Sequence, residues 1–374
     1  MRAARLTAIL ALAALAAGAS ALSAGETKPR LKTIAAKSPY LPVQVLPDPD
    51  RRRVDIVIGS ELFTSYRYPT NLKKPVLYPL AMADGTVITR NFPPRAGERA
   101  DHPHHVGLWF NYGNVDGIDF WNNSDAIKPE DRPHMGTIEH RKVVSAKSGS
   151  DSGELEVETE WLGPDGKPML NEHTRFVFRG TADSRSVDRI TTLIALDKRV
   201  TFPDNKEGVL GMRVARSLEL PSKKDETFTD STGRAITVAA MDNSVVTGNY
   251  LTSEGKTGDD AWGTRGRWCV LTGKVNQEPV SIAILDHPQN PGYPTYWHAR
   301  GYGLFAANPL GQSALSDGKE TLNFALDPHQ SVTFRHRILI LSKTATAGDV
   351  EKAWMEFTTA RQSTSPKTVK AAKK

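Results

Sequence analysis

Short segments of strand length, separated by turn residues, run through most of this 374-residue chain and limit the folds open to it. The segment GELEVETEWL (153–162) alternates polar and apolar residues, as a half-buried strand does. A turn-rich link that begins GPDGKP joins it to HTRFVFRG (173–180), and Asp84-Gly85 lies between two further apolar stretches, which is a strong hairpin signal. With 29 glycines and 24 prolines to supply turns, this spacing predicts an all-β protein, a large antiparallel β-sandwich.

Other segments extend this pattern, and one segment breaks it. Only 347–362 reads as a helix, with Val350, Trp354 and Phe357 on one face, and we expect it to pack on the edge of a sheet. The sequence shows no repeat of roughly 20–50 residues and no glycine-rich phosphate loop, which argues against a propeller, a solenoid or a nucleotide site. The further strand-like segments are 54–59, 61–68, 184–196, 211–220, 266–275, 279–286, 320–327 and 331–341.

Both ends of the chain are predicted to lie outside the sandwich. Residues 1–24 fit a secretory signal peptide, with a basic start, an apolar run over 6–18 and small residues at two candidate cleavage sites. The alternative for the apolar run is an N-terminal membrane anchor, although it is short for a bilayer span and no later stretch approaches that length. We therefore expect a Pro-rich lead over 25–53, one β-sandwich domain over 54–360, a disordered basic tail over 361–374, and a periplasmic or secreted protein.

The charge of the body narrows the range of partners. Two of the positive charges behind the formal net charge of +6 lie in the signal peptide and five in the tail, so the remainder is close to neutral. Nothing in this balance marks a nucleic-acid surface. The single cysteine, Cys269, excludes an intramolecular disulfide, and its strand-like surroundings predict a buried apolar role.

A histidine cluster stands out in DHPHHVGLWF (101–110). Three of the ten histidines, His102, His104 and His105, lie within four positions and beside Asp101. Pro103 disfavours a helix at the residue before it, so this stretch is a loop or the start of a strand. We weigh acid–base or binding histidines at a sugar cleft against a metal site and against a polar loop that hydrogen-bonds the backbone.

The metal alternative has its own geometry. In an extended strand, His102 and His104 share one face and form a plausible pair of ligands for a divalent metal. A third ligand would come from elsewhere in the chain. The candidates are His298, His173 and Glu207.

Aromatic and polar residues are interspersed in the stretch that follows, WFNYGNVDGIDFWNN (109–123). Trp109 and Trp121 offer apolar faces and Asn111 offers an amide, a mixture that suits a carbohydrate cleft. The alternative is a hydrophobic core strand with turn residues.

Two later motifs add charged groups. In PGYPTYWHARGYGLFAANPLG (291–311), Trp297 adjoins His298, which shares a strand face with Arg300 by spacing. An arginine there suits a carboxylate or a polarised oxygen, and the alternative is a surface-facing strand edge. In NKEGVLGMRVARSLEL (205–220), Glu207 is a candidate acid or base with Arg213 close by, and the alternative is a solvated loop glutamate.

The motifs DHPHHVGLWFNYGNVDGIDFW, KEGVLGMRVA and YWHARGYGLFAANPLG together resemble the bacterial exported family called "PmoA-like", a methane-oxygenase name, over roughly 54–341. The membrane subunit behind that name is a multi-helix protein, whereas this chain shows no membrane span after its signal peptide, so we reject the oxygenase activity. The resemblance implies a role in polysaccharide and glycoside utilisation and a fold like the galactose-mutarotase-type β-supersandwich. The family commonly has arginine where this chain has Val106.

The same resemblance implies roles for individual residues. By fold-level analogy, His105 and His298 are acid–base candidates, Glu207 is the carboxylate, and Arg213 and Arg300 hold substrate.

Taken together, the motifs predict an exported carbohydrate-active protein, an isomerase, lyase or hydrolase that acts on a sugar or glycoside. The alternatives are a non-catalytic carbohydrate-binding protein and a structural envelope protein. The predicted catalytic residues are His104, His105, Glu207 and His298, and the predicted substrate-binding residues are Asp101, Trp109, Asn111, Trp121, Arg213, Trp297 and Arg300.

Overall fold

The structure of the protein is a computed structural model that describes residues 38–239 and 242–359. All of these residues belong to one compact unit, which begins at Ser38. The predicted signal peptide (1–24), most of the predicted lead and the predicted tail (361–374) lie outside the described residues.

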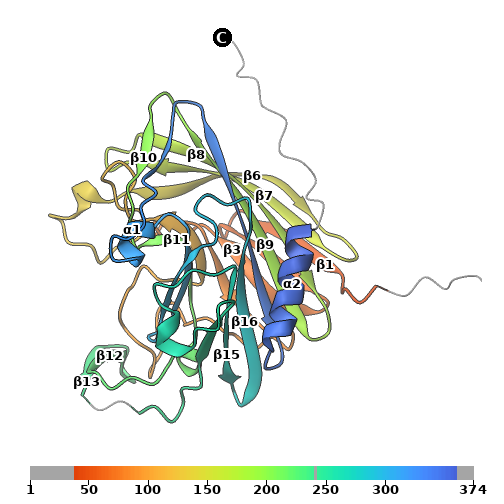
Figure 1. The fold of residues 1–374 in the computed structure, drawn as a ribbon. Coiled ribbons are helices and arrows are strands. Elements are labelled where there is room, and N and C mark those ends of the chain that lie inside the picture. Colours follow the sequence, from red (N-terminus) through yellow and green to blue (C-terminus); the bar gives the residue numbers. More distant parts are fainter. Residues whose placement is uncertain (1–37, 240–241, 360–374) are drawn as a thin grey trace, which may run out of the picture. The chain divides into compact units, whose positions relative to one another are not determined.

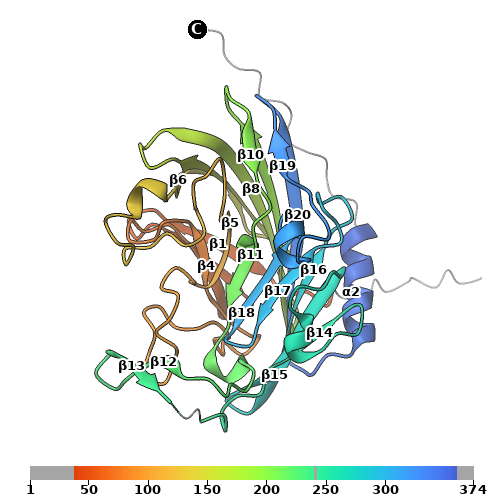
Figure 2. The ribbon, with the colours of Figure 1, turned by 60° about the vertical axis from the view of Figure 1, so that its left-hand side comes forward.

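Two eight-stranded sheets dominate the described residues, and every pairing between their strands is antiparallel. We call the sheet that holds the N-terminal strands the front sheet; Figure 2 shows β4, β5, β11, β18 and β17 of this sheet side by side. Its order is β1 (Val43–Asp48), β2 (Arg53–Ile58), β3 (Glu61–Arg67), β4 (Val76–Leu80), β5 (Leu108–Tyr112), β11 (Gly208–Arg213), β18 (Leu304–Asn308) and β17 (Tyr296–Arg300).

The second large sheet, the back sheet, contains the longest strands of the described chain (Figure 1). Its order is β14 (Asn249–Thr252), β15 (Trp268–Val275), β16 (Glu278–Asp286), β20 (Ser331–Leu341), β9 (Ser184–Ala195), β8 (Pro168–Gly180), β7 (Gly153–Leu162) and β6 (Thr137–Lys147). Two small ribbons pair β10 (Val200–Phe202) with β19 (Phe324–Leu326) and β12 (Glu226–Thr229) with β13 (Ala235–Val238). Short 3₁₀ turns are η1 (Arg132–His134), η2 (Arg216–Leu218) and η3 (Gly258–Ala261), and the α-helices are α1 (Gln312–Leu315) and α2 (Ala347–Thr359).

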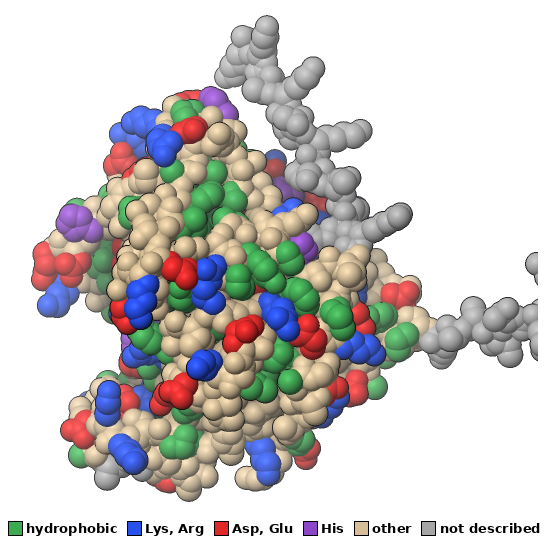
Figure 3. Space-filling model, in the orientation of Figure 1, with side chains coloured by type: hydrophobic (Ala, Val, Ile, Leu, Met, Phe, Trp, Pro, Cys, Tyr) green, Lys and Arg blue, Asp and Glu red, His purple; other side chains and the backbone are tan. Residues whose placement is uncertain are grey.

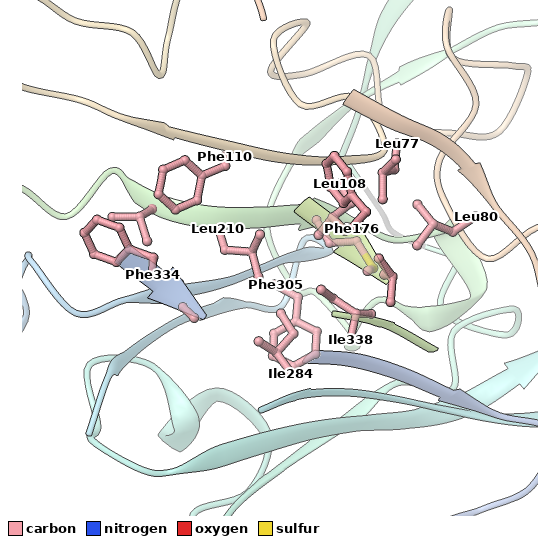
Figure 4. Packing of buried hydrophobic residues seen from close by; sticks show 14 of the residues in the cluster. Leu77, Leu80, Leu108, Phe110, Phe176, Leu210, Ile284, Phe305, Phe334 and Ile338 are labelled. Atoms are coloured by element: carbon pink, nitrogen blue, oxygen red, sulfur yellow. The ribbon is translucent and has the colours of Figure 1, made fainter. Parts of the chain in front are cut away.

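The main core lies between the two sheets. In β7 the residues alternate between buried and half-buried, because successive side chains of a strand point to opposite faces. Figure 4 shows apolar side chains of both sheets meeting, with Phe110 and Leu210 from the front sheet and Phe334 and Ile338 from the back sheet. Burial of each such side chain stabilises the fold by about 1.5–3 kcal/mol. The predicted all-β antiparallel sandwich is confirmed.

The predicted C-terminal helix is also confirmed, but its position differs from the prediction. Val350 and Phe357 of α2 are buried with Trp268, Val270 and other residues that face away from the main core. The helix therefore covers the outer face of the back sheet at β15 and β16, rather than its edge (Figure 1). The predicted face is right because an apolar stripe at helical spacing needs an apolar partner surface.

Three boundaries correct the sequence prediction. β1 lies inside the predicted lead and pairs with β2 along its whole length, so the sandwich begins before residue 54. Pro47 within β1 masked this strand, and proline is tolerated there because β1 is at the edge of the sheet. The predicted strand over 211–220 ends at Arg213, and the one over 320–327 is confined to β19.

Three further features concern the burial of the cysteine, the helices and the surface of the described residues. Cys269 is buried in β15, as predicted. None of the helices in the described part of the chain has the length and apolarity of a membrane span. Figure 3 shows acidic and basic side chains interspersed over one face of the molecule.

Candidate functional site

The candidate site lies on the outer face of the front sheet, the face turned away from the main core. The register of β5, β11, β18 and β17 sets Trp109, Gly211, Ala306 and His298 side by side in one row across these strands. Arg300, two positions beyond His298, points to the same face because strand side chains alternate. Motifs separated by about two hundred positions in the sequence therefore meet here.

The tryptophans on and beside this sheet are core residues. Trp109 and Trp121 have no exposed surface and pack edge to face, with ring centroids 5.2 Å apart. A Cβ atom on Gly211 would lie 2.6 Å from the Trp109 ring and 2.8 Å from the Trp121 ring, so the two rings fill the space over this glycine. Trp297 is buried in the main core. The prediction that these three tryptophans bind substrate is therefore wrong. The core alternative holds for Trp109 and Trp121, and Trp297 is a core residue rather than part of a surface-facing strand edge.

Asn111 was also predicted to bind substrate, and it is fully buried. Its amide donates a hydrogen bond of 2.6 Å to the carbonyl oxygen of Phe120. This bond ties β5 to the loop that carries Trp121, so Asn111 positions the aromatic floor of the site and does not reach its surface.

The histidine-rich stretch is a turn rather than a strand. His102 has a left-handed backbone with φ +45°, and the His105 N–H donates to the His102 carbonyl oxygen over 3.0 Å. His102 therefore stacks on His105, with ring centroids 4.7 Å apart and planes within 4°, instead of sharing a face with His104. Gly107 ends the turn with φ +57°, and a Cβ atom there would overlap the Leu77 carbonyl oxygen.

Arg90 holds this turn in place, and sequence reasoning missed it. Its guanidinium is 3% exposed and donates to the backbone carbonyl oxygens of Asp101, His102 and His105 over 2.7–3.0 Å. It also reaches the Asp101 carboxylate at 3.0 Å. No local pattern marks such a residue, because its partners are backbone atoms.

A second buried arginine, Arg213, fixes Asp101 and His105. Its Nη2 lies 2.5 Å from Asp101 Oδ1 and its Nη1 lies 3.2 Å from His105 Nδ1. Because Arg213 is fully buried, it positions the turn and does not clamp substrate directly, which corrects the prediction. Burial acts to raise the pKa of Asp101, but His102, Arg213 and Arg90 outweigh it and hold the pKa well below its usual range.

His102 covers His105 and faces the surface. It is 38% exposed, lies 2.9 Å from Asp101 through its Nδ1, and stacks on the Tyr302 ring at 5.0 Å. His105, 2% exposed, stacks in turn on Trp109 at 5.0 Å. Burial lowers the pKa of His105 well below its usual value. His105 therefore supports the exposed His102 from below as a neutral ring.

The open carboxylate–imidazole pair of the site is Glu207 with His298. Glu207 Oε2 lies 3.8 Å from His298 Nδ1, and the Glu207 side chain is 18% exposed. Burial raises the pKa of Glu207, against the opposing effect of Lys206. Burial, followed by the charge of Arg300, lowers the pKa of His298 to about 3. Both residues were predicted, and the structure brings them together.

Arg300 lies beside this pair. Its guanidinium carbon is 5.3 Å from the centre of the Trp262 ring and 5.8 Å from that of Tyr302. Tyr302 also lies over Arg213, and burial raises its pKa to about 12. Trp262 and Tyr302 were missed by the sequence analysis, although Tyr302 stands between two glycines directly after the Arg300 motif.

His104 packs edge to face against the stacked rings, with its ring centroid 4.4 Å from that of His105 and 5.7 Å from that of His102. It borders a small cavity of about 220 Å³ together with Lys74, whose Nζ donates to the His104 carbonyl oxygen over 2.9 Å. Burial lowers the pKa of Lys74 to about 7. His104 is therefore next to the candidate site rather than inside its Glu207–His298 part.

No group of three histidine, cysteine or acidic side chains is arranged to hold a metal ion within residues 38–239 and 242–359. His173, proposed as a third ligand, lies on β8 of the back sheet, 3.7 Å from Glu156. The hypothesis that His102 and His104 bind a divalent metal therefore stays a prediction. None of the proposed third ligands, His298, His173 and Glu207, completes a group of three with them in the described residues.

A larger cavity, about 940 Å³, lies elsewhere, lined by Pro47, Arg52, Tyr68 and His140 among others. Tyr68 stacks on His140 at 3.9 Å and Tyr66 contacts the same imidazole, so the histidine of this cavity is engaged by two tyrosines. We place the candidate site at Glu207 and His298 because chemistry depends on such a pair more than on volume.

Comparisons with known proteins bear on the family and on the fold of the chain. Residues 53–355 match the model of a family described as "Family of unknown function (DUF6807)". A comparison with curated proteins finds no match. The family description names no activity, so the similarity to the "PmoA-like" family stays a prediction.

The chain is similar to several solved structures. These include Slr1438 protein from Synechocystis sp. PCC 6803 (10% identity, 80% of this chain and 96% of that chain, TM-score 0.38). A galactose mutarotase-like protein from Clostridium acetobutylicum (10%, 82% and 100%, 0.38) and a putative aldose 1-epimerase from Escherichia coli K12 (11%, 80% and 98%, 0.31) are similar too. At these identities and TM-scores, the activity of this chain has to be argued from its own side chains.

Proposed function

Since the chain belongs to the DUF6807 family, whose function is unknown, its activity has to be inferred from its site, and we propose that it is a carbohydrate-active enzyme that moves protons with Glu207 and His298. The observation that carries this proposal is the pair itself. A part-exposed carboxylate faces a buried imidazole at 3.8 Å, on a sheet face where Trp109, Ala306 and other apolar side chains pack together.

The two members of the pair suit opposite roles. His298 is held neutral by burial, so at ordinary pH it presents an unprotonated ring nitrogen that acts as a weak base or as a hydrogen-bond acceptor. Burial shifts the pKa of Glu207 upward, towards the range in which a carboxyl group both donates and accepts protons. Pairs whose environments separate their protonation states are typical of acid–base sites.

Proton transfer fits this site better than hydrolysis by two carboxylates. Hydrolysis of that kind needs a second carboxyl group that is able to act as nucleophile or base. Other carboxylates nearby are engaged: the oxygens of Asp101 contact Arg90, Arg213 and His102, and those of Asp119 accept hydrogen bonds from the backbone of Trp121 and from Asn122. We therefore favour an isomerase or a lyase among the carbohydrate enzymes.

Three features support a sugar as substrate. Carboxylate, imidazole and guanidinium groups alternate around the site, and such groups hydrogen-bond hydroxyls. The part-exposed Tyr302 and Trp262 supply aromatic surface. The resemblance of the motifs to a family linked to glycoside utilisation points the same way. The predicted signal peptide places this activity in the periplasm or outside the cell as part of the proposal.

A non-catalytic carbohydrate-binding protein is the second candidate. Binding modules use exposed aromatic faces, but Trp109, Trp121 and Trp297 are all buried. The site instead exposes titratable groups, which binding alone does not need. This difference favours the enzyme.

The test is proton NMR of the protein in deuterated buffer with a panel of aldoses, uronic acids and glycosides. We expect deuterium at a sugar carbon, a faster change of anomer ratio or a new unsaturated product, relative to samples without protein. Ligand line-broadening without any conversion would support the binding protein instead. A panel with neither conversion nor broadening would overturn the carbohydrate proposal.

A further inference from the structure

Arg300 is the feature of the site that the acid–base proposal leaves unexplained. Its strand position puts the side chain on the same face as His298, next to the Glu207 pair. Among the described residues, no carboxylate forms an ion pair with Arg300 and its guanidinium donates no hydrogen bond. Its charge nevertheless acts to lower the pKa of both His298 and Tyr302.

The other two arginines around the site use their terminal Nη groups on protein partners. Arg90 donates to four backbone carbonyl oxygens and to Asp101. Arg213 is shared between Asp101 and His105. Two buried guanidinium groups therefore form ion pairs with Asp101, and Asp101 forms none with Arg300.

Aromatic rings hold Arg300 in place without using its donors. Its guanidinium carbon lies over the Trp262 and Tyr302 rings, and cation–π contacts of this kind use none of the hydrogen-bond acceptors that would occupy its in-plane N–H groups. These in-plane donors match the two oxygens of a carboxylate in a bidentate contact. Because one unpaired guanidinium balances one negative charge, a carboxylate fits better than a doubly charged phosphate.

The spacing suits a single sugar unit. Residues two apart on one strand face have Cα atoms about 6.6 Å apart, which is on the scale of one pyranose ring. A sugar whose carboxylate meets Arg300 therefore has its ring over His298 and Glu207.

We infer that Arg300 selects sugars that carry a carboxylate, so that uronic acids or their glycosides are the substrates of this site. The inference rests on the proposed function, because it names the substrate class of the same acid–base pair. Trp262 and Tyr302 act as positioning residues, since they orient Arg300 and leave its N–H groups for the substrate.

The test compares glucuronate and galacturonate with their methyl esters, with the neutral parent sugars and with glucose 6-phosphate. Conversion and binding are both followed by NMR, using wild type, Arg300→Gln and Arg300→Lys. We expect wild type to prefer the free acid over its ester, and Arg300→Gln to lose roughly 10- to 100-fold in kcat/KM or affinity for the acid alone. Arg300→Lys keeps the charge but not the fork, so it should recover part of the loss.

A matched control removes an equal charge elsewhere. Arg175→Gln lies on β8 of the back sheet, where Arg175 pairs with Glu154, and it should leave the preference unchanged. Circular dichroism and the thermal midpoint of each variant establish that it is folded.

The outcomes separate the two proposals. Uronate binding that depends on Arg300, without conversion, supports the substrate class and overturns the enzyme. Conversion of neutral sugars and esters as readily as acids overturns the substrate class and supports the enzyme. A preference for the sugar phosphate, or equal handling of the acid by wild type and Arg300→Gln, also overturns the inference, and no binding to any member overturns both.

Discussion

Two carboxylate–histidine pairs in this protein look alike in distance and differ in everything around them. On the outer face of the front sheet, Glu207 and His298 lie 3.8 Å apart. Between the sheets, Asp286 of β16 and His336 of β20 lie 3.6 Å apart and are at most 1% exposed. Both histidines have a pKa lowered to about 3 by burial.

The inner pair is closed by other partners. Asp286 accepts hydrogen bonds from the Asn290 amide at 2.7 Å and from the Thr295 N–H at 2.8 Å. Around Glu207 and His298, Lys206 Nζ lies 3.5 Å from the carboxylate and the Lys206 backbone hydrogen-bonds the His298 ring, but His298 Nδ1 has no hydrogen-bond partner among the described residues. The comparison teaches that distance alone does not mark an active pair; unfilled hydrogen-bonding capacity beside an exposed surface does.

The largest expected effect separates the pairs by stability. Asp286→Ala leaves the Thr295 N–H unpaired in the core and removes one of the two acceptors of the Asn290 amide, and it should lower the free energy of unfolding by about 3 kcal/mol. Glu207→Ala removes a part-exposed group with a loose contact and should cost about 1 kcal/mol or less. Urea unfolding at pH 7 measures both. Equal losses would mean that the outer pair is as structural as the inner one.

A smaller effect appears in the pH dependence of stability. Both histidines have a folded pKa near 3, below the value of about 6.5 for an unfolded histidine. The unfolded chain therefore binds more protons between these values, and the free energy of unfolding falls as the pH falls from about 6.5 towards 3. Asp286 opposes this trend, because burial raises its pKa to about 7.

Replacing either histidine by asparagine isolates its contribution. His298→Asn and His336→Asn should each reduce the slope of the unfolding free energy against pH by about 1.4 kcal/mol per pH unit within that window. Urea titrations at several pH values between about 4 and 6.5 give these slopes. A variant whose curve runs parallel to that of wild type would show that its histidine is not held neutral by the fold.

Much of the fold was predictable because strand alternation and hairpin turns are local signals. β7 and the β7–β8 hairpin follow directly from the polar–apolar alternation and the GPDGKP turn. β1 was missed because Pro47 and the charged turn after it hide its alternation, and because its pairing with β2 is a tertiary contact. The helix face was visible in the sequence, whereas the surface that it covers was not.

The site was predicted in part, for a related reason. Glu207, His298 and Arg300 were predicted because they are polar residues beside apolar strands. Alternation does not tell whether the outer face of such a strand is exposed or covered by a second apolar cluster, as it is at Trp109 and Trp121. Trp109 was predicted to bind substrate because it lies among polar residues in the sequence. It is a core residue instead, because both faces of β5 are buried. Arg90, Lys74 and Trp262 carry no local signal, because their partners are backbone carbonyl oxygens or residues far away in the sequence.

The most direct test of the acid–base pair is the effect of Glu207→Gln on conversion and on binding of the same sugar, with Glu158→Gln on β7 as the matched control. The sugar is the one that exchanges deuterium fastest with wild type. We predict that Glu207→Gln lowers kcat by about 10²–10⁴-fold and leaves Kd within about threefold, while the control changes neither. Conversion by Glu207→Gln at close to the wild-type rate would contradict the proposal that this pair moves the proton.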